Sequence, residues 1–195
     1  MRIHNVTRHD EEIVVAQTGS EVSFISDAEL TRCRIVLKVA SVSIRHATFI
    51  DCTIEAKRQL SNREFYGNRF VRCTFKGRYH GCGFGDSPEL YGPGELVDAD
   101  FSAAELYGCR FLNVDVSRIH FPRWPCFTIV DPANAGALRE QPWPDSRYEV
   151  LVDITLTPAR GTVAVSWHAP TLVKKMGGTE EELRRLLEPL PFVIL

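Results

Sequence analysis

The sequence predicts a solenoid of short repeats followed by a small α+β appendage, and three observations support this class. A period of five is neither the two of a β-strand nor the 3.6 of an α-helix. The period ends near residue 121, and the rest of the chain follows ordinary strand and helix patterns. The clearest part of the repeat has a bulky apolar residue at every fifth position: Phe101, Leu106, Phe111, Val116 and Phe121.

The same period continues upstream, with slips of register. Repeats at a constant spacing predict units that stack on their neighbours. The bulky positions are Leu30, Ile35, Ile44, Phe49, Ile54, Phe65, Phe70, Phe75, Phe84 and Leu96. A smaller apolar residue usually stands two places earlier, as at Ala28, Cys33, Ala47, Cys52, Cys73, Cys82, Ala99, Ala104 and Cys109. Arg63 and Asn68 interrupt this second row.

These repeats resemble the pentapeptide-repeat family, whose loose consensus is A-(D/N)-L-x-x. The segment ADFSAAELYGCRF, beginning at Ala99, carries it best, and the resemblance covers about residues 24–121. It implies a mainly β fold, a right-handed quadrilateral β-helix of about five coils with both apolar positions inward. The expected domains are an N-terminal capping segment (residues 1–23), the β-helix (24–121) and an α+β cap or appendage (122–195).

Four pentads per coil would place core residues about twenty positions apart in one column. This spacing predicts a first column of Phe49, Phe70, Leu90 and Phe111. It predicts two more columns, one of Ile35, Ile54, Phe75, Leu96 and Val116, and one of Ile44, Phe65, Phe84 and Leu106. The fourth column is the least well defined, and contains Leu60, Phe101 and Phe121.

The cysteines and glycines offer little evidence of chemistry. Most of the six cysteines fall on inward positions, where thiols act as small buried apolar groups. His80 and Cys82 lie near Cys73, but no C-x2-C pair accompanies them, so no metal site is expected. The segment GCGFGDSPELYGPGE lacks the Lys-Ser/Thr ending of a phosphate loop and predicts a turn-rich protrusion between coils. We therefore expect no catalytic residue, cofactor or metal.

Charge is distributed unevenly along the chain. Residues 32–78 contain eleven basic residues against three acidic ones, a surplus of eight positive charges, whereas residues 86–115 contain seven acidic residues against one basic. The first region predicts a basic wall that binds a complementary partner. Its candidate partner-binding residues are Arg32, Arg34, Arg45, Arg69, Arg72, Lys76 and Arg78. Arg32, Asp51 and Arg72 share one expected column, which would place the aspartate between two arginines.

The remaining third of the chain predicts an α+β appendage. Residues 148–156 and 162–167 alternate like two strands of a hairpin, with the turn at TPARG. The segment TEEELRRLLEPL predicts a helix with Thr179 as N-cap and Glu182 completing a capping box. An appendage here would cover the exposed edge of the last coil. The family resemblance implies dimerisation through the C-terminal coils, a contact that the appendage would block or replace.

Composition narrows the function classes without naming one. The formal net charge is -2, the N-terminal residues lack the apolar run of a signal peptide, and no stretch could span a bilayer, so a cytoplasmic protein is expected. A rigid rod without a catalytic constellation favours a non-enzymatic module that binds a protein partner, for example one that neutralises a bacterial toxin. Nucleic acid and membrane are not expected partners, and a homodimer stays open.

Two alternatives remain. The resemblance also implies mimicry of duplex DNA, by which family members occupy a type II topoisomerase (gyrase), but that activity needs an acidic wall. The other alternative is an enzyme with a site between rod and appendage, near Trp124, Trp143 or His168. The aromatic residues there are more readily explained by packing.

Overall fold

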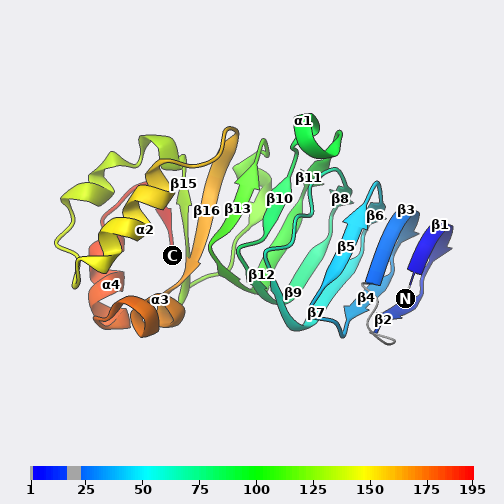
Figure 1. Ribbon diagram of the computed structural model, residues 1–195, viewed down its shortest axis with the longest axis horizontal. Coiled ribbons are helices and arrows are strands. Elements are labelled where there is room, and N and C mark those ends of the chain that lie inside the picture. Colours follow the sequence, from blue (N-terminus) through cyan, green and yellow to red (C-terminus); the bar gives the residue numbers. More distant parts are fainter. Residues whose placement is uncertain (1, 17–22) are drawn as a thin grey trace.

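The computed structural model describes residues 2–16 and 23–195. It is mainly β, with 47% strand and 21% helix, and forms a β-solenoid of about five turns with an α+β appendage at its C-terminal end (Figure 1). The expected fold class is therefore confirmed. The expected N-terminal segment lies partly outside the described residues, and the division into three domains stays a prediction.

Short strands joined by tight corners form the solenoid. They are β1 (Arg2–His9), β2 (Glu12–Val15), β3 (Ser23–Thr31), β4 (Arg34–Leu37), β5 (Val42–Arg45), β6 (Thr48–Ile50), β7 (Thr53–Ser61), β8 (Arg69–Val71), β9 (Thr74–His80), β10 (Gly83–Gly85), β11 (Glu95–Val97), β12 (Ala99–Tyr107), β13 (Cys109–Leu112) and β14 (Ile119–His120). Two short helices interrupt them, α1 (Pro88–Tyr91) and the 3-10 helix η1 (Val116–Arg118).

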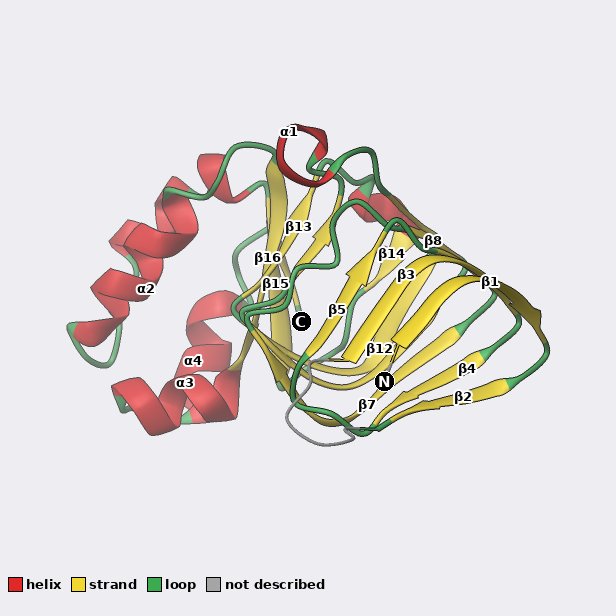
Figure 2. Ribbon diagram, turned by 45° about the vertical axis from the view of Figure 1, so that its right-hand side comes forward, coloured by secondary structure: helices red, strands yellow, loops and turns green. Residues whose placement is uncertain are grey.

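The appendage mixes strands and helices, which group beside the end of the solenoid (Figure 2). Its elements are β15 (Cys126–Val130), the 3-10 helices η2 (Pro132–Asn134) and η3 (Gly136–Glu140), α2 (Arg147–Leu156), β16 (Thr162–His168), α3 (Ala169–Met176), α4 (Glu180–Leu187) and β17 (Val193–Ile194).

The described residues form three sheets. Sheet A has the order β1-β3-β6-β8-β11, with β5 also paired to β3, and sheet B has the order β14-β12-β9-β7-β4-β2. All pairs in these two sheets are parallel, as stacked coils require. Sheet C, of order β10-β13-β16-β15-β17, begins with parallel coil strands and continues into the appendage through antiparallel pairs.

Bulky side chains stack in columns inside the coils. Phe49 pairs in register with Phe70, with ring centroids 4.8 Å apart, and Phe70 pairs with Leu96. Phe75 lies over Phe101 with centroids 4.4 Å apart. Such offset or parallel ring contacts add to the stabilisation that burial of apolar surface already provides. The core is therefore a continuous stack of side chains along the axis of the solenoid.

The expected column that joined Phe70 to Phe111 is wrong. Phe111 instead pairs in register with Phe84, and Leu90 is 77% exposed on α1. The insertion that contains α1 lengthens this coil, so a constant step of twenty residues fails there. For the same reason Leu96 stacks on Phe70 rather than on Phe75.

The fourth column is also corrected. Leu60 pairs with Tyr79, and Tyr79 pairs with Leu106, so Leu60 does not share a column with Phe101, and Leu106 does not share one with Phe84. Phe84 stacks on its other expected neighbour, Phe65, with ring centroids 5.0 Å apart. Tyr79 is fully buried and its hydroxyl donates to the carbonyl of Ile54 at 3.1 Å. Because its hydroxyl is hydrogen-bonded, the tyrosine can occupy a core position that the pentad pattern gives to leucine or phenylalanine.

One interruption of the repeat is a buried asparagine. Asn68 is 1% exposed, and its amide nitrogen donates to the carbonyls of Ile44, Phe65 and Tyr66. Its amide oxygen accepts from the backbone N–H of Ala47 at 3.0 Å. Because the side chain makes these bonds, a polar residue can replace the small apolar residue of the consensus without leaving a buried polar group unpaired.

The appendage attaches to the solenoid by extending sheet C beyond its last coil strand, β13. β16 pairs antiparallel with β13, which covers the edge that the last coil would otherwise expose. The expected strand at 148–156 is wrong, because residues Arg147–Leu156 form the helix α2. Its buried side chains, Tyr148, Leu151, Val152 and Thr155, follow a helical spacing, whereas the exposed Val150 and Ile154 create the apparent alternation.

The last helix has the start that the sequence predicts. The backbone N–H of Glu182 donates to the Thr179 hydroxyl at 3.2 Å, and the Thr179 N–H donates to the Glu182 carboxylate at 2.8 Å. This reciprocal pair is the capping box. Among the helices of the described residues, none is both long enough and apolar enough to cross a membrane.

Candidate functional site

The seven candidate arginines and lysines do not form one wall. Arg32 and Arg72 stand at one corner of the solenoid, Arg34, Lys76 and Arg78 on sheet B, and Arg45 and Arg69 on sheet A. They differ as well in whether a carboxylate neutralises them. The structure therefore distributes the seven residues over three sides of the solenoid, and Lys76 and Arg78 are the two that share one strand.

The corner that contains Arg32 and Arg72 carries alternating charges. Its residues stack in register, since the N–H of Arg32 donates to the Ile50 carbonyl and that of Asp51 to the Val71 carbonyl. The alternating column consists of Asp10, Arg32, Asp51, Arg72, Asp98 and Arg118, and we call it the corner ladder.

Each arginine of the corner ladder binds the aspartate of the preceding coil with two hydrogen bonds. They measure 2.7 and 2.6 Å for Arg32–Asp10 and 2.9 and 2.7 Å for Arg118–Asp98. The hydrogen bond from Arg32 holds the pKa of Asp10 below its usual value of 3.8. The expected position of an aspartate between two arginines is confirmed at Asp51, which binds Arg72 and has Arg32 on its other side.

Carboxylates also neutralise Arg34 and Arg69. Arg34 lies between Glu12 and Glu55 on the neighbouring strands of sheet B and is paired with both. Arg69 is paired with Glu95, its partner in register on β11. Carboxylates thus largely compensate the charges of four candidate residues, which join neighbouring coils: Arg32, Arg34, Arg69 and Arg72.

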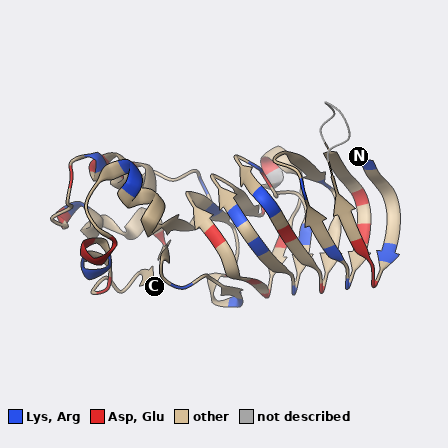
Figure 3. Cartoon of the chain, turned by 90° about the horizontal axis from the view of Figure 1, so that it is seen from below, with Lys and Arg blue, Asp and Glu red and all other residues tan. Residues whose placement is uncertain are grey.

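Four cations on sheet B form what we call the basic face: Lys57 and Arg58 on β7, and Lys76 and Arg78 on β9. All four are exposed, and only Lys57 has an ion pair, with Glu55, within the described residues. Between the in-register pairs Ala56–Gly77 and Leu60–Tyr79, three residues of β7 face one of β9. This bulge places Lys57 and Arg58 opposite Arg78. Figure 3 shows bands of Lys and Arg on adjacent strands in the middle of this side of the solenoid.

Lys57 and Arg58 were not singled out by sequence reasoning. The pentad pattern assumes that every side of the coil has the same length. It therefore cannot reveal a bulge in which β7 has two residues more than β9. The signal that could have found them is the step from Ile54 to Leu60, which is six residues long, one more than a pentad, and contains the polar residues KRQ.

The acidic segment, residues 86–115, does not form an acidic wall. Glu95 binds Arg69, Asp98 binds Arg118, and Asp115 accepts from the N–H of Ser117 to cap η1. Asp86 accepts from the N–H of Gly94 at 2.8 Å. These carboxylates serve local structure, and they lie on different sides of the coils.

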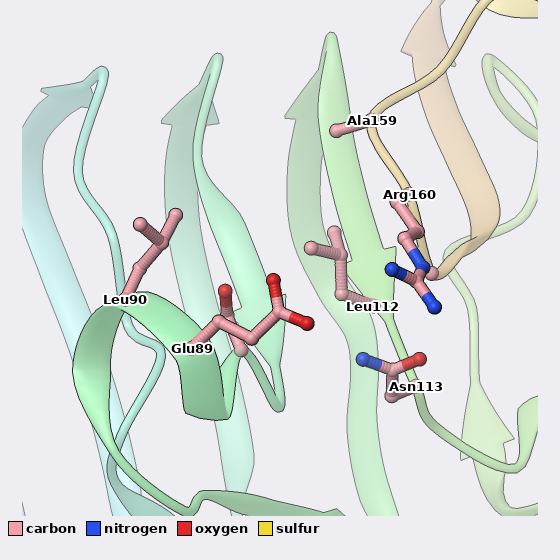
Figure 4. A pocket seen from close by; sticks show the side chains of 8 residues that line it. Glu89, Leu90, Leu112, Asn113, Ala159 and Arg160 are labelled. Atoms are coloured by element: carbon pink, nitrogen blue, oxygen red, sulfur yellow. The ribbon is translucent and has the colours of Figure 1, made fainter.

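The protrusion expected from the glycine-rich segment is confirmed as α1. Beside it lies a cavity of about 450 Å3, lined by Ser87, Glu89, Leu90, Leu112, Asn113, Ala159, Arg160 and Gly161. Figure 4 shows Glu89 on one side and Arg160 with Asn113 on the other. The charged lining residues, Glu89 and Arg160, are exposed to solvent.

The cysteines occupy packing positions. All six are buried and free, and the thiols of Cys33, Cys52 and Cys73 lie in one column. Burial raises the pKa of the Cys126 thiol to about 11, which keeps it protonated and unreactive near neutral pH. Within the described residues, no three His, Cys, Asp or Glu side chains are arranged to hold a metal ion.

The aromatic residues of the expected enzyme site are also used in packing. The Trp143 indole N–H donates to the Leu138 carbonyl at 2.8 Å, and its ring stacks on Tyr148. Trp124 packs against the core of the appendage. His168 differs from these, because it lies beside two titratable side chains of the solenoid.

The number of inward residues per coil decides the architecture. One coil contributes Ile44, Phe49, Ile54 and Leu60, and the next contributes Phe65, Phe70, Phe75 and Tyr79, each of them buried. Each coil therefore has four inward positions about five residues apart, so each pentad forms one of its four sides. The chain is a β-solenoid of about five turns.

Comparisons with known proteins add little to this assignment. No family model matches the sequence, and no curated protein matches it. Among solved structures, the chain is similar to trypsin-treated QnrB1, a plasmid-mediated fluoroquinolone resistance protein, with 12% identity and a TM-score of 0.20. The match covers 63% of this chain and 71% of that one. Because this TM-score is low, the description of the fold depends on the coil geometry of the chain itself.

Proposed function

We propose that this β-solenoid is a pentapeptide-repeat protein and a non-enzymatic interaction module, whose basic face binds an acidic surface of a protein partner. The observation that carries the proposal is the grouping of Lys57, Arg58, Lys76 and Arg78 on two adjacent strands. Three of them have no ion pair within the described part of the chain. A rigid parallel sheet holds them in fixed positions, which lowers the entropic cost of binding.

The proposal narrows the predicted set of binding residues. Lys76 and Arg78 remain, and Lys57 and Arg58 join them. Arg45 is exposed on another sheet, and the carboxylates described above compensate the rest: Arg32, Arg34, Arg69 and Arg72. Exposed compensated pairs contribute little to binding, whereas uncompensated cations attract an acidic partner and accelerate its association.

Neutralisation of a bacterial toxin in the cytoplasm is the specific role to test first. A toxin with an acidic active surface would fit the basic face by charge. DNA-mimicking inhibition of a topoisomerase has less support, because it requires an acidic wall, whereas Glu95 and Asp98 of the acidic segment are paired with arginines of this chain. A supercoiling assay with gyrase separates the two roles.

Affinity purification from a native bacterial lysate, with the protein as bait, would identify the partner. The decisive comparison is then between the wild type and a K76E/R78E variant. We expect charge reversal on the basic face to weaken binding by more than about tenfold at low salt, and the difference to shrink as salt screens the charges. An R160E/R185E variant, which reverses two arginines outside the basic face, should bind like the wild type.

Two results would overturn the proposal. One is equal affinity of the wild type and K76E/R78E for the purified partner. The other is loss of the captured partner after nuclease treatment, which would show that nucleic acid bridged the two proteins.

A further inference from the structure

A group of titratable side chains lies where the solenoid meets the appendage. Glu105 of β12 stands between His80 of β9 and His168, which ends β16 and precedes α3. Nε2 of His80 is 3.1 Å from Oε1 of Glu105, and Nδ1 of His168 is 3.7 Å from the same oxygen. One carboxylate oxygen therefore faces two imidazoles, one from each part of the molecule.

The surrounding contacts come mainly from β12 and α3. The Tyr107 ring packs beside His80, with centroids 5.2 Å apart, and the Lys175 ammonium of α3 donates to the Tyr107 hydroxyl at 3.1 Å. Nδ1 of His168 is 2.8 Å from the hydroxyl oxygen of Thr171 in the first turn of α3. The contact between Lys175 and Tyr107 ties α3 to the side of the solenoid.

Other titratable groups face the same joint from each neighbouring element. Arg78 of β9 is the register partner of Glu105, and the thiol of Cys126 on β15 accepts from the N–H of Leu106. The charge of Glu180 on α4 acts to raise the pKa of His168. The buried thiol of Cys126 stays neutral near neutral pH, because burial raises its pKa. Histidine is the side chain here whose ordinary pKa lies between pH 5 and 8.

Burial makes the neutral form of His168 the favoured one. Its side chain is only 15% exposed, and burial lowers its pKa below the ordinary 6.5, with Glu105 opposing the shift and His80 adding to it. His168 is also the N-cap of α3, where the positive end of the helix dipole disfavours an imidazolium. Protonation of both imidazoles would place two positive charges beside a single carboxylate.

We propose that His80, Glu105 and His168 form a proton-sensitive clasp that fastens α3 to the solenoid near neutral pH and loosens as the pH falls. The sign follows from His168. A histidine whose pKa is lower in the folded state stabilises that state fully above 6.5, and this contribution is lost as the pH falls below 6.5 toward the folded value. The β13–β16 pairing holds the appendage throughout, so the change is confined to α3 and its contacts.

Amide hydrogen exchange in α3 tests the clasp in the intact protein. Protection of Ala169–Met176, corrected for the intrinsic exchange rate, should be several-fold lower at about pH 5.5 than at about pH 7.5, while protection of β6 and β8 stays unchanged. A His168→Gln variant should lose this pH dependence. His120→Gln, which removes an exposed histidine on β14, should behave like the wild type.

An NMR titration of the imidazoles provides the second measurement and does not depend on a variant that folds poorly. The pKa of His168 in the wild type should lie below 6.5, and Glu105→Gln should lower it further, because the carboxylate raises it. A His168 pKa at or above 6.5, or one that Glu105→Gln leaves unchanged, would overturn the proposal. Equal pH dependence of α3 protection in the wild type and His168→Gln would overturn it as well.

Discussion

Arg72 donates two hydrogen bonds to the carboxylate of Asp51 on the preceding coil, at 2.6 and 2.9 Å. The same arrangement recurs twice more along this corner, at Arg32–Asp10 and Arg118–Asp98. A long basic run in the sequence therefore becomes, at this corner, a neutral ladder that joins one coil to the next. The charge available to a partner lies elsewhere, on β7 and β9.

The backbone at Arg72 predicts how substitutions there will behave. Its φ is +53°, a region that glycine adopts freely and β-branched residues avoid. We expect Arg72→Gly to lower the Tm less than Arg72→Val does, because both lose the ion pair but only valine adds strain. Thermal unfolding followed by circular dichroism measures the difference. A glycine variant less stable than the valine variant would contradict the backbone explanation.

The corner ladder also predicts a loss of stability in acid. Hydrogen bonds from arginine lower the pKa values of Asp10, Asp51 and Asp98 from the usual 3.8. Carboxylates with lowered pKa values stabilise the folded state above pH 3.8, and this contribution is lost as the pH falls through the folded pKa. Urea unfolding at about pH 6 and pH 3 should therefore show a smaller loss for D10N/D51N/D98N than for the wild type. An equal loss in both proteins would mean that other carboxylates determine the acid sensitivity.

The corrected columns predict which apolar side chains matter for stability. Phe75 is fully buried and stacks on Phe101, so Phe75→Ala should reduce the free energy of unfolding by about 3–5 kcal/mol. Leu90 is 77% exposed on α1, so Leu90→Ala should change it by less than about 0.5 kcal/mol. Urea denaturation of both variants tests this contrast. A large loss of unfolding free energy in Leu90→Ala would indicate that Leu90 is buried in the column with Phe70 and Phe111, and would contradict the structure.

The period of five residues predicts much of the solenoid, because each inward position is buried independently of which column it joins. The same counting places Arg32, Asp51 and Arg72 at one corner, where every coil between them has nearly the expected length. It fails after Phe84, since the insertion containing α1 changes the length of one coil. The local sequence does not show how many residues of this coil belong to the protrusion rather than to its sides.

The appendage and the binding surfaces were harder to predict. Val150 and Ile154 are each 59% exposed, and their apolar character makes a helix look like an alternating strand. The basic face depends on a bulge in β7, and the clasp depends on a contact between Glu105 and His168 that no sequence spacing encodes. Both features arise from tertiary pairing, whereas the capping box at Thr179 arises from neighbouring residues and was predicted correctly.

The register of the coils positions both the basic face and the clasp, and a double-mutant cycle tests it most directly. Phe84 and Phe111 stack with ring centroids 5.4 Å apart, so the pair F84L and F111L should show a coupling energy of about 0.5–1.5 kcal/mol in urea unfolding. Phe70 belongs to another column, so F70L and F111L should be additive within about 0.5 kcal/mol. Strong coupling of Phe70 to Phe111, with none between Phe84 and Phe111, would contradict this register.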